Sequence, residues 1–187
     1  MRHTPFVLAA VLATASAAPA AGQQQPPDPD RCRNTPEHRQ LDFWIGTWDV
    51  IRPDDGQKLG ENTIAPVEGL NGCALMENWT SARGFSGKSL NFYDVQRRTW
   101  RQVWVDGFGS ALDYREGELR DGAMHFTGIT IDAAGDTTLQ KLVFTPVAAD
   151  TVRQVFESSS DGGATWTTDW VGVYIRRPPT GSTGGGS

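Results

Sequence analysis

Histidine and cysteine are scarce in this sequence, and their scarcity limits the chemistry that the chain can support. The 187 residues include three histidines and two cysteines. None of them forms a His-x-His, His-x-x-Glu or Cys-x-x-Cys pattern, the spacings typical of metal sites. A Gly-x-Ser-x-Gly nucleophile motif and a glycine-rich strand-to-helix turn for phosphate groups are also missing. We therefore expect no metal, no cofactor and no nucleophilic catalytic residue.

The sequence also lacks clusters of positive charge. It contains 17 Lys and Arg against 22 Asp and Glu, a formal net charge of −5. Nucleic acids and anionic lipid surfaces bind proteins through clustered Lys and Arg. Neither is therefore expected as a partner. The apolar run at residues 6–12 is far shorter than the roughly 20 residues of a membrane-spanning helix, so we expect no integral membrane segment.

The first 22 residues have the layout of a secretory signal peptide. Arg2 and His3 form a basic start, residues 6–12 form an apolar core, and small residues follow at 15–20. This layout predicts an exported protein, periplasmic or extracellular; the alternative is a disordered alanine-rich leader. The sequence further predicts a Pro/Gln-rich spacer at 23–30, one domain at 31–177 and a flexible Gly/Ser tail at 178–187.

The two cysteines, Cys32 and Cys73, form an even pair. In an exported protein such a pair is more often oxidised than free. A bridge between them would close a loop of roughly 40 residues and stabilise the fold by about 3–4 kcal/mol. The alternative, a metal pair, lacks a third and a fourth clustered ligand. We predict the disulfide Cys32–Cys73.

Regular turn signals divide the rest of the chain into short runs rich in β-branched and aromatic residues. The breaks are too short for crossover helices, so neighbouring strands should pair antiparallel. We predict a single ten-stranded antiparallel up-and-down barrel, preceded by one helical turn at 36–40 with Thr35 as its N-cap. The predicted strands are 42–52, 60–68, 73–82, 88–95, 99–106, 110–116, 123–131, 137–146, 151–158 and 165–176.

The first predicted strand, LDFWIGTWDV, is the most apolar segment after the leader. Gly46 within it predicts a bend where another part of the chain approaches closely. If strands pair in order, this strand meets the last one and closes the barrel. Eight strands leave an interior that side chains about fill, so ten strands predict a cavity.

Residue alternation predicts which side chains face that cavity. Charged residues are costly to bury unpaired, so the faces that carry Arg101, Lys141 and Arg153 should point outward. The opposite faces then form an interior of large aromatic side chains and glutamines, a composition typical of ligand pockets. An alternative use of the tryptophans, stacking on sugars, is less usual than a place in the core. The predicted ligand-binding residues are Glu77, Trp79, Gln102, Trp104, Gln154 and Phe156.

Glu77 lies between Leu75 and Trp79 on one strand face, and it has two possible environments. Inside the barrel it should have a raised pKa, or a partner such as Arg153 or Lys88. A rim carboxylate in a salt bridge is the more common arrangement for such a residue.

Several segments carry a resemblance to known proteins. The run FWIGTW resembles the Gly-x-Trp opening strand of calycin-like barrels, in which the tryptophan seals one end. The set LDFWIGTWDV, GCALMENW, SLNFYD, TWRQVWVDGFG and VRQVFESSSDGGATW, covering about 31–177, is similar to a secreted bacterial lipocalin-like family without an assigned function. The resemblance implies the fold and a secreted setting, and it brings no catalytic residues.

More distantly, the chain resembles fatty-acid-binding proteins and nitrobindins. Nitrobindins hold haem on a histidine inside the barrel. Here the candidates are His38, before the barrel, and His125, whose direction on the seventh strand alternation leaves open. A lone strand histidine is more often structural, so haem is a minor alternative.

Residues 159–166, SSDGGATW, match the Asp-box pattern known from sialidases and other β-proteins. In this pattern Asp161 accepts backbone N–H groups across the turn, and Trp166 packs beneath it. One copy predicts a structural hairpin rather than sialidase activity.

The sequence thus favours a barrel that binds one small, largely apolar or amphipathic molecule. Two alternatives belong to other classes. One is an enzyme of the cyclase or hydratase type, which needs Glu77 or Asp113 pointing inward beside a polar partner. The other is a cell-envelope interaction module with a filled barrel and an exposed aromatic patch. The ligand and the oligomeric state are not encoded in any motif.

Overall fold

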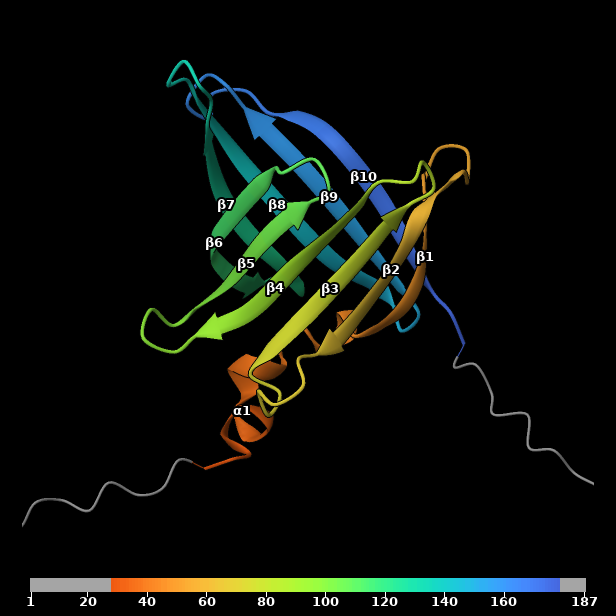
Figure 1. Ribbon diagram of the computed structural model, residues 1–187, viewed down its shortest axis with the longest axis vertical. Coiled ribbons are helices and arrows are strands. Elements are labelled where there is room, and N and C mark those ends of the chain that lie inside the picture. Colours follow the sequence, from red (N-terminus) through yellow and green to blue (C-terminus); the bar gives the residue numbers. More distant parts are fainter. Residues whose placement is uncertain (1–27, 179–187) are drawn as a thin grey trace, which may run out of the picture.

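A computed structural model describes residues 28–178, which form ten strands closed into one antiparallel barrel (Figure 1). The predicted signal peptide, most of the spacer and nearly all of the tail lie outside the described residues. The strands are β1 (Gly46–Ile51), β2 (Lys58–Pro66), β3 (Ala74–Ser81), β4 (Ser86–Asp94), β5 (Thr99–Asp106), β6 (Ala111–Arg120), β7 (Ala123–Ile131), β8 (Thr137–Ala148), β9 (Thr151–Ser159) and β10 (Thr167–Arg176).

The barrel closes through β1, which pairs with β2 on one side and with β10 on the other. The β1–β10 register places Trp48 opposite Arg176 and Val50 opposite Tyr174. Every neighbouring pair is antiparallel, as connections of a few residues require. The predicted fold class is therefore confirmed.

The first predicted strand is too long. Asp42–Trp44 form a 3₁₀ turn, η2, and the strand begins at Gly46. The reason is Arg176, whose guanidinium donates to the carbonyl oxygens of Ile45 at 2.5 Å and Phe43 at 2.9 Å. Gly46 has φ +148°, and a β-carbon there would overlap this guanidinium. The close approach that Gly46 predicted is thus made by the Arg176 side chain.

Trp44 and Trp48 close the end of the barrel next to η2, and both are fully buried. The Trp48 indole N–H donates to the Trp44 carbonyl oxygen at 2.9 Å, and the Arg176 guanidinium lies 4.0 Å from the Trp48 ring centroid. The Trp44 ring packs 4.4 Å from that of Phe144 on β8. The sealing role that the resemblance implied for a tryptophan is performed here by a pair.

Two further helical segments lie outside the same end (Figure 1): α1 (Arg31–Asn34), which was not predicted, and the 3₁₀ turn η1 (Pro36–Arg39). Thr35 precedes η1 but does not cap it, because its hydroxyl donates to the Arg31 carbonyl oxygen at 2.6 Å. The turn is held instead by Trp100 of β5, whose indole N–H reaches the Glu37 carbonyl oxygen at 3.1 Å.

Alternation assigned the strand faces correctly. Trp100 and Gln102 of β5 are buried inside the barrel. Arg101, between them, pairs with Asp113 of β6 at 2.8 Å on the outer surface. Within residues 28–178, no helix has both the length and the apolar character needed to cross a membrane.

The hairpin between β9 and β10 has the structure that its motif predicts. Asp161 accepts the Thr165 backbone N–H at 2.9 Å, and the Ser159 hydroxyl donates to it at 2.7 Å. These hydrogen bonds hold the pKa of the Asp161 carboxyl well below its usual range. The Trp166 indole donates to the Gly163 carbonyl oxygen at 3.1 Å, and the Lys141 ammonium lies over its ring.

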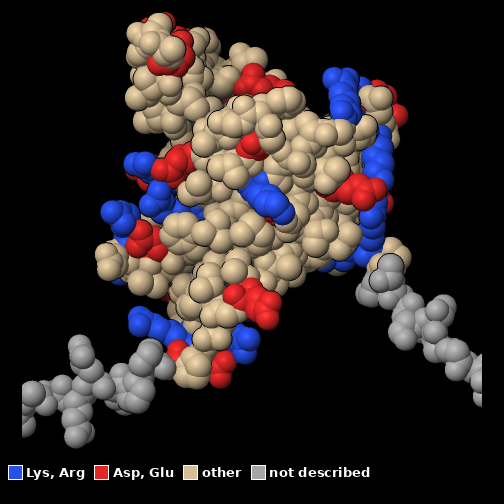
Figure 2. Space-filling model, viewed as in Figure 1, with Lys and Arg blue, Asp and Glu red and all other residues tan. Residues whose placement is uncertain are grey.

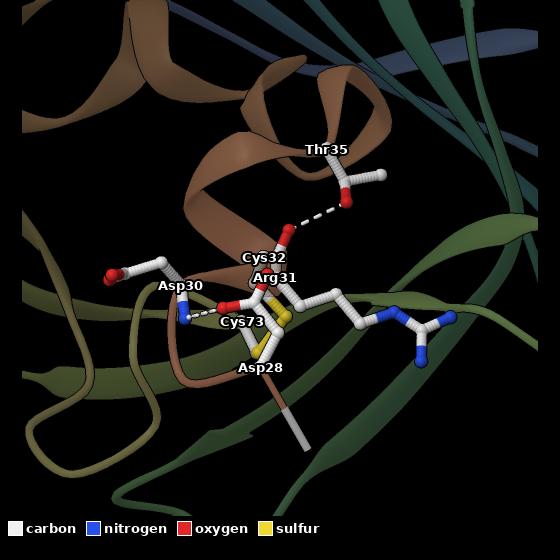
Figure 3. The surroundings of a disulfide bond; sticks show 6 residues. All are labelled: Asp28, Asp30, Arg31, Cys32, Thr35 and Cys73. Atoms are coloured by element: carbon white, nitrogen blue, oxygen red, sulfur yellow. Dashed lines mark hydrogen bonds between the residues drawn. A yellow bond between two sulfur atoms is a disulfide. The ribbon is translucent and has the colours of Figure 1, made fainter. Parts of the chain in front are cut away.

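The predicted disulfide is present and joins Cys32 of α1 to Cys73, the residue before β3 (Figure 3). The two α-carbons are 5.0 Å apart, and 41 positions separate the cysteines in sequence. The bridge attaches α1 to the residue before β3, whereas η1 is attached separately through Trp100 of β5.

Replacing both cysteines, as Cys32→Ala with Cys73→Ala, should lower the free energy of unfolding by about 3–4 kcal/mol, because the unfolded chain regains the freedom of a closed loop. Urea denaturation of the wild type and the double variant measures the difference. A reducing agent should destabilise the wild type and leave the double variant unchanged. A double variant within about 1 kcal/mol of the oxidised wild type would contradict this role.

Candidate functional site

A cavity of about 280 Å³ lies inside the barrel, toward the end away from the helical segments. Phe85, in the β3–β4 hairpin, lines it, and that hairpin lies at the end opposite α1 (Figure 1). Trp79 and Trp104 also line the cavity, and each lies near the C-terminal end of its strand, β3 or β5, at the same end of the barrel as this hairpin. The cavity therefore has an aromatic mouth at the open end and a floor above the buried tryptophan pair.

All six predicted ligand-binding residues line this cavity, so alternation brought together side chains from β3, β5 and β9. Whether they bind a ligand stays a prediction. The sequence did not single out six further lining residues: Phe85, Leu112, Tyr114, Leu142, Trp170 and Tyr174.

Inward-facing glycines make room for the indole rings of the wall. A β-carbon on Gly87 of β4 would overlap the Trp104 ring, and one on Gly60 of β2 would overlap the Trp79 ring. Each ring thus lies flat across a neighbouring strand instead of projecting into the barrel. The glycines are therefore one reason why large aromatic side chains leave space between them.

Glu77 is buried inside the barrel, only 4% exposed, and is not a rim carboxylate. The partners predicted for it are wrong. The Lys88 ammonium donates to Asn78, and Arg153 is exposed on the outer face of β9. One carboxyl oxygen of Glu77 instead accepts the Asn62 amide at 2.6 Å, and the other accepts the Ser89 hydroxyl at 2.5 Å.

These contacts belong to a band of hydrogen bonds that runs along the inner wall from β9 to β5 and passes from β10 to β2 across β1. On one side of Glu77, Asn91 donates to the Ser89 hydroxyl oxygen at 2.8 Å, and Gln102 donates to the Asn91 oxygen at 2.8 Å. On the other side the Asn62 amide also reaches the Tyr174 hydroxyl at 3.4 Å, and that hydroxyl donates to Gln154. The members, in order around the wall, are Gln154, Tyr174, Asn62, Glu77, Ser89, Asn91 and Gln102.

Hydrogen-bond donors in this band point toward Glu77 from both neighbours. Burial raises the pKa of the Glu77 carboxyl, and the hydrogen bonds from Ser89 and Asn62 oppose that shift. Burial also raises the pKa of Tyr174 and Tyr114, with a further contribution from the negative charge of Glu77, so both phenols stay protonated. The cavity floor therefore presents one acidic group and several neutral polar groups.

The other residues considered for chemistry lie elsewhere. Asp113 points outward, where it accepts hydrogen bonds from Arg101 and Arg115. His125 lies between the buried residues Met124 and Phe126 and therefore faces outward. His38 belongs to η1, where it is buried beside Tyr93 of β4. Neither histidine lines the cavity. Across residues 28–178 no three His, Cys, Asp or Glu side chains gather as a metal site requires.

The inward direction of some members of this hydrogen-bonded band could have been predicted from the sequence. Asn62 shares the inward face of β2 with Gly60 and Ile64, and Ser89 and Asn91 share the inward face of β4. Neutral polar residues on a face that also carries glycine or apolar residues indicate an inward direction. Their mutual contacts depend on register, which no local pattern contains.

Compared with known proteins, the sequence matches no family model and no curated protein. The closed ten-stranded barrel is compatible with a calycin-like fold.

Glu77→Gln should raise the free energy of unfolding at neutral pH, because it removes a buried ionisable group. A carboxyl whose pKa is higher in the folded state stabilises the fold below its unfolded pKa of about 4.5, and this contribution is lost as pH rises through the folded-state value. The advantage of the variant should therefore grow upward from about pH 4.5, by about 1.4 kcal/mol for each unit of the shift.

Urea denaturation across this pH range measures the advantage of the variant. Glu157→Gln on the outer face of β9 is the matched control and should show no such growth. An advantage that stays constant with pH would contradict the assigned environment of Glu77.

Gly87→Ala should lower the free energy of unfolding by about 1–3 kcal/mol, because the new methyl group must displace the Trp104 ring toward the cavity. Thermal unfolding and tryptophan fluorescence report the loss and the ring movement. Gly107→Ala is the control, since a β-carbon there meets only the Ser86 carbonyl oxygen at 3.5 Å. Equal effects of the two substitutions would show that the position of the Trp104 ring does not depend on Gly87.

Proposed function

We propose that the barrel binds one small, largely apolar molecule in its cavity. The observation that carries this proposal is an interior space of about 280 Å³ walled by aromatic and aliphatic side chains, near the lower end of the size range of ligand pockets. Transfer of apolar ligand surface from water into such a space supplies about 25 cal/mol per Å². A protein that used the barrel only as a scaffold would gain more stability by filling this volume.

The proposed binding residues divide into two groups. Trp79, Trp104 and Phe156 would contact the apolar body of the ligand near the mouth. Glu77, Gln102 and Gln154 would orient its polar end, because they combine a cavity position with places in the hydrogen-bonded band.

We further propose that the chain acts outside the cytoplasm, as a member of the secreted lipocalin-like barrels that it resembles. The Cys32–Cys73 disulfide supports this setting, because such bridges persist in oxidising compartments. The signal-peptide layout at residues 1–22 supports it independently.

An enzyme of the cyclase or hydratase type is the second candidate. It is favoured by one observation, a buried carboxyl that lines a cavity, since burial raises the pKa of such a group and suits it to serve as a general acid or base. Turnover of a cavity-sized substrate that Glu77→Gln abolishes would support the enzyme over the carrier. An interaction module fits less well, because its barrel should be filled, although Phe108 is 81% exposed and stacks on Phe85 at the mouth.

Native mass spectrometry of the protein purified from its own source, followed by extraction of bound small molecules, tests the carrier directly. We expect an apolar or amphipathic passenger at up to one copy per chain. A protein that is isolated empty and that binds no apolar probe would contradict the proposal.

Leu112→Trp should weaken binding of an apolar probe, because the larger side chain takes up part of the cavity that Leu112 lines. Titration of octanol by calorimetry measures the change, and a loss of at least about tenfold in affinity is expected. Leu119→Trp is the matched control, because Leu119 belongs to the same strand, is exposed, and does not line the cavity. Equal losses in both variants would contradict a ligand site at this position.

A further inference from the structure

The Glu77 carboxylate has acceptor capacity that the protein does not use. A carboxylate offers roughly four lone-pair sites, and the hydrogen bonds from Asn62 and Ser89 occupy two of them. Both hydrogen-bond partners are neutral, and no Lys or Arg side chain of residues 28–178 forms an ion pair with Glu77. A buried acidic group without a counter-ion is costly, and it lines the cavity where a ligand would meet it.

The wall above Glu77 is also suited to a positive charge. Trp79, Trp104 and Trp170 line the same cavity. The Trp79 and Trp170 rings pack edge to face, with 6.3 Å between their centroids. Indole faces attract cations through the negative face of the ring, and tryptophan does so more strongly than the other aromatic residues. Among the lining residues Glu77 is the one acidic side chain, and none is basic.

The surface around the mouth of the cavity carries mainly negative charge. The hairpin loops at the open end carry mainly acidic residues, against the basic residues Arg52 and Arg83. Figure 2 shows this on the β7–β8 hairpin at the upper left, where acidic side chains appear without basic ones. A negative rim raises the local concentration of cations and lowers that of anions. The acidic residues of these loops are Asp54, Asp55, Asp132, Asp136 and Asp161.

We infer that the ligand is an amphipathic amine: an apolar body held between the indole rings, with a protonated nitrogen that donates to the Glu77 carboxylate. This inference rests on the proposed function and names the class of its ligand. A carboxylate ligand would face Glu77 and the acidic rim with a like charge. A neutral alcohol would use one acceptor site and leave the charge of Glu77 unbalanced.

Three probes with the same eight-carbon chain separate these classes: octylamine, octanol and octanoate, each titrated by calorimetry at neutral pH. The wild type should bind octylamine at least about tenfold more tightly than octanol, and octanoate least tightly of the three. Octanol affinity equal to that of octylamine, or a preference for octanoate, would overturn the amine while leaving the carrier function in place. Failure of all three probes to bind would contradict the carrier function itself.

Variants of Glu77 assign the preference to this residue. Glu77→Gln should remove most of the preference for octylamine over octanol, whereas Glu77→Asp should keep a preference for the amine. Glu157→Gln, on the outer face, should behave as the wild type. Circular dichroism establishes that each variant is folded. An octylamine preference that survives in Glu77→Gln would overturn the role of this carboxylate.

Discussion

The pairing of β1 with β10 is the contact on which the rest of the molecule depends. It turns ten short strands, none of which could bury both of its faces alone, into a cylinder without an exposed edge. Arg176 secures the junction, because its guanidinium satisfies the carbonyl oxygens of the 3₁₀ turn before β1 and covers the Trp48 ring. The two fully buried tryptophans that follow from this arrangement close one end, and so the cavity can open only toward the other.

The interior combines two environments with opposite physical demands. Near the mouth, aromatic rings lie flat over inward-facing glycines, and their surfaces gain free energy when water leaves them. Deeper, polar side chains from several strands are linked by hydrogen bonds in a band around Glu77, both of whose carboxyl oxygens accept one. A buried polar group is tolerated only when its hydrogen bonds are made, so the band explains how an acidic residue can lie so deep in the barrel. Glu77 also lines the cavity.

The sequence predicted much of the fold because its signals are local. Turn residues at regular spacing located all ten strands, and the alternation of Trp100, Gln102 and Trp104 with Arg101 assigned the inward face of β5 before any pairing was known. Gln102, Trp104, Gln154 and Phe156 were found in the same way, since the opposite faces of β5 and β9 carry charged residues. Glu77 and Trp79 were proposed without such a signal, because the opposite face of β3 carries no charged residue. The disulfide followed from an even count of cysteines in a chain with a predicted export signal.

What the sequence could not supply is the identity of contacts between strands distant along the chain. Glu77 was matched with Lys88 or Arg153 by charge, whereas register places Asn62 and Ser89 beside it and directs both cations outward. The first strand likewise starts late because Arg176, 130 positions after Gly46, bends the segment before it. Local patterns therefore determined which residues form strands and which way they face. Barrel closure and register decided which of them meet, because these are properties of the assembled sheet rather than of any single segment.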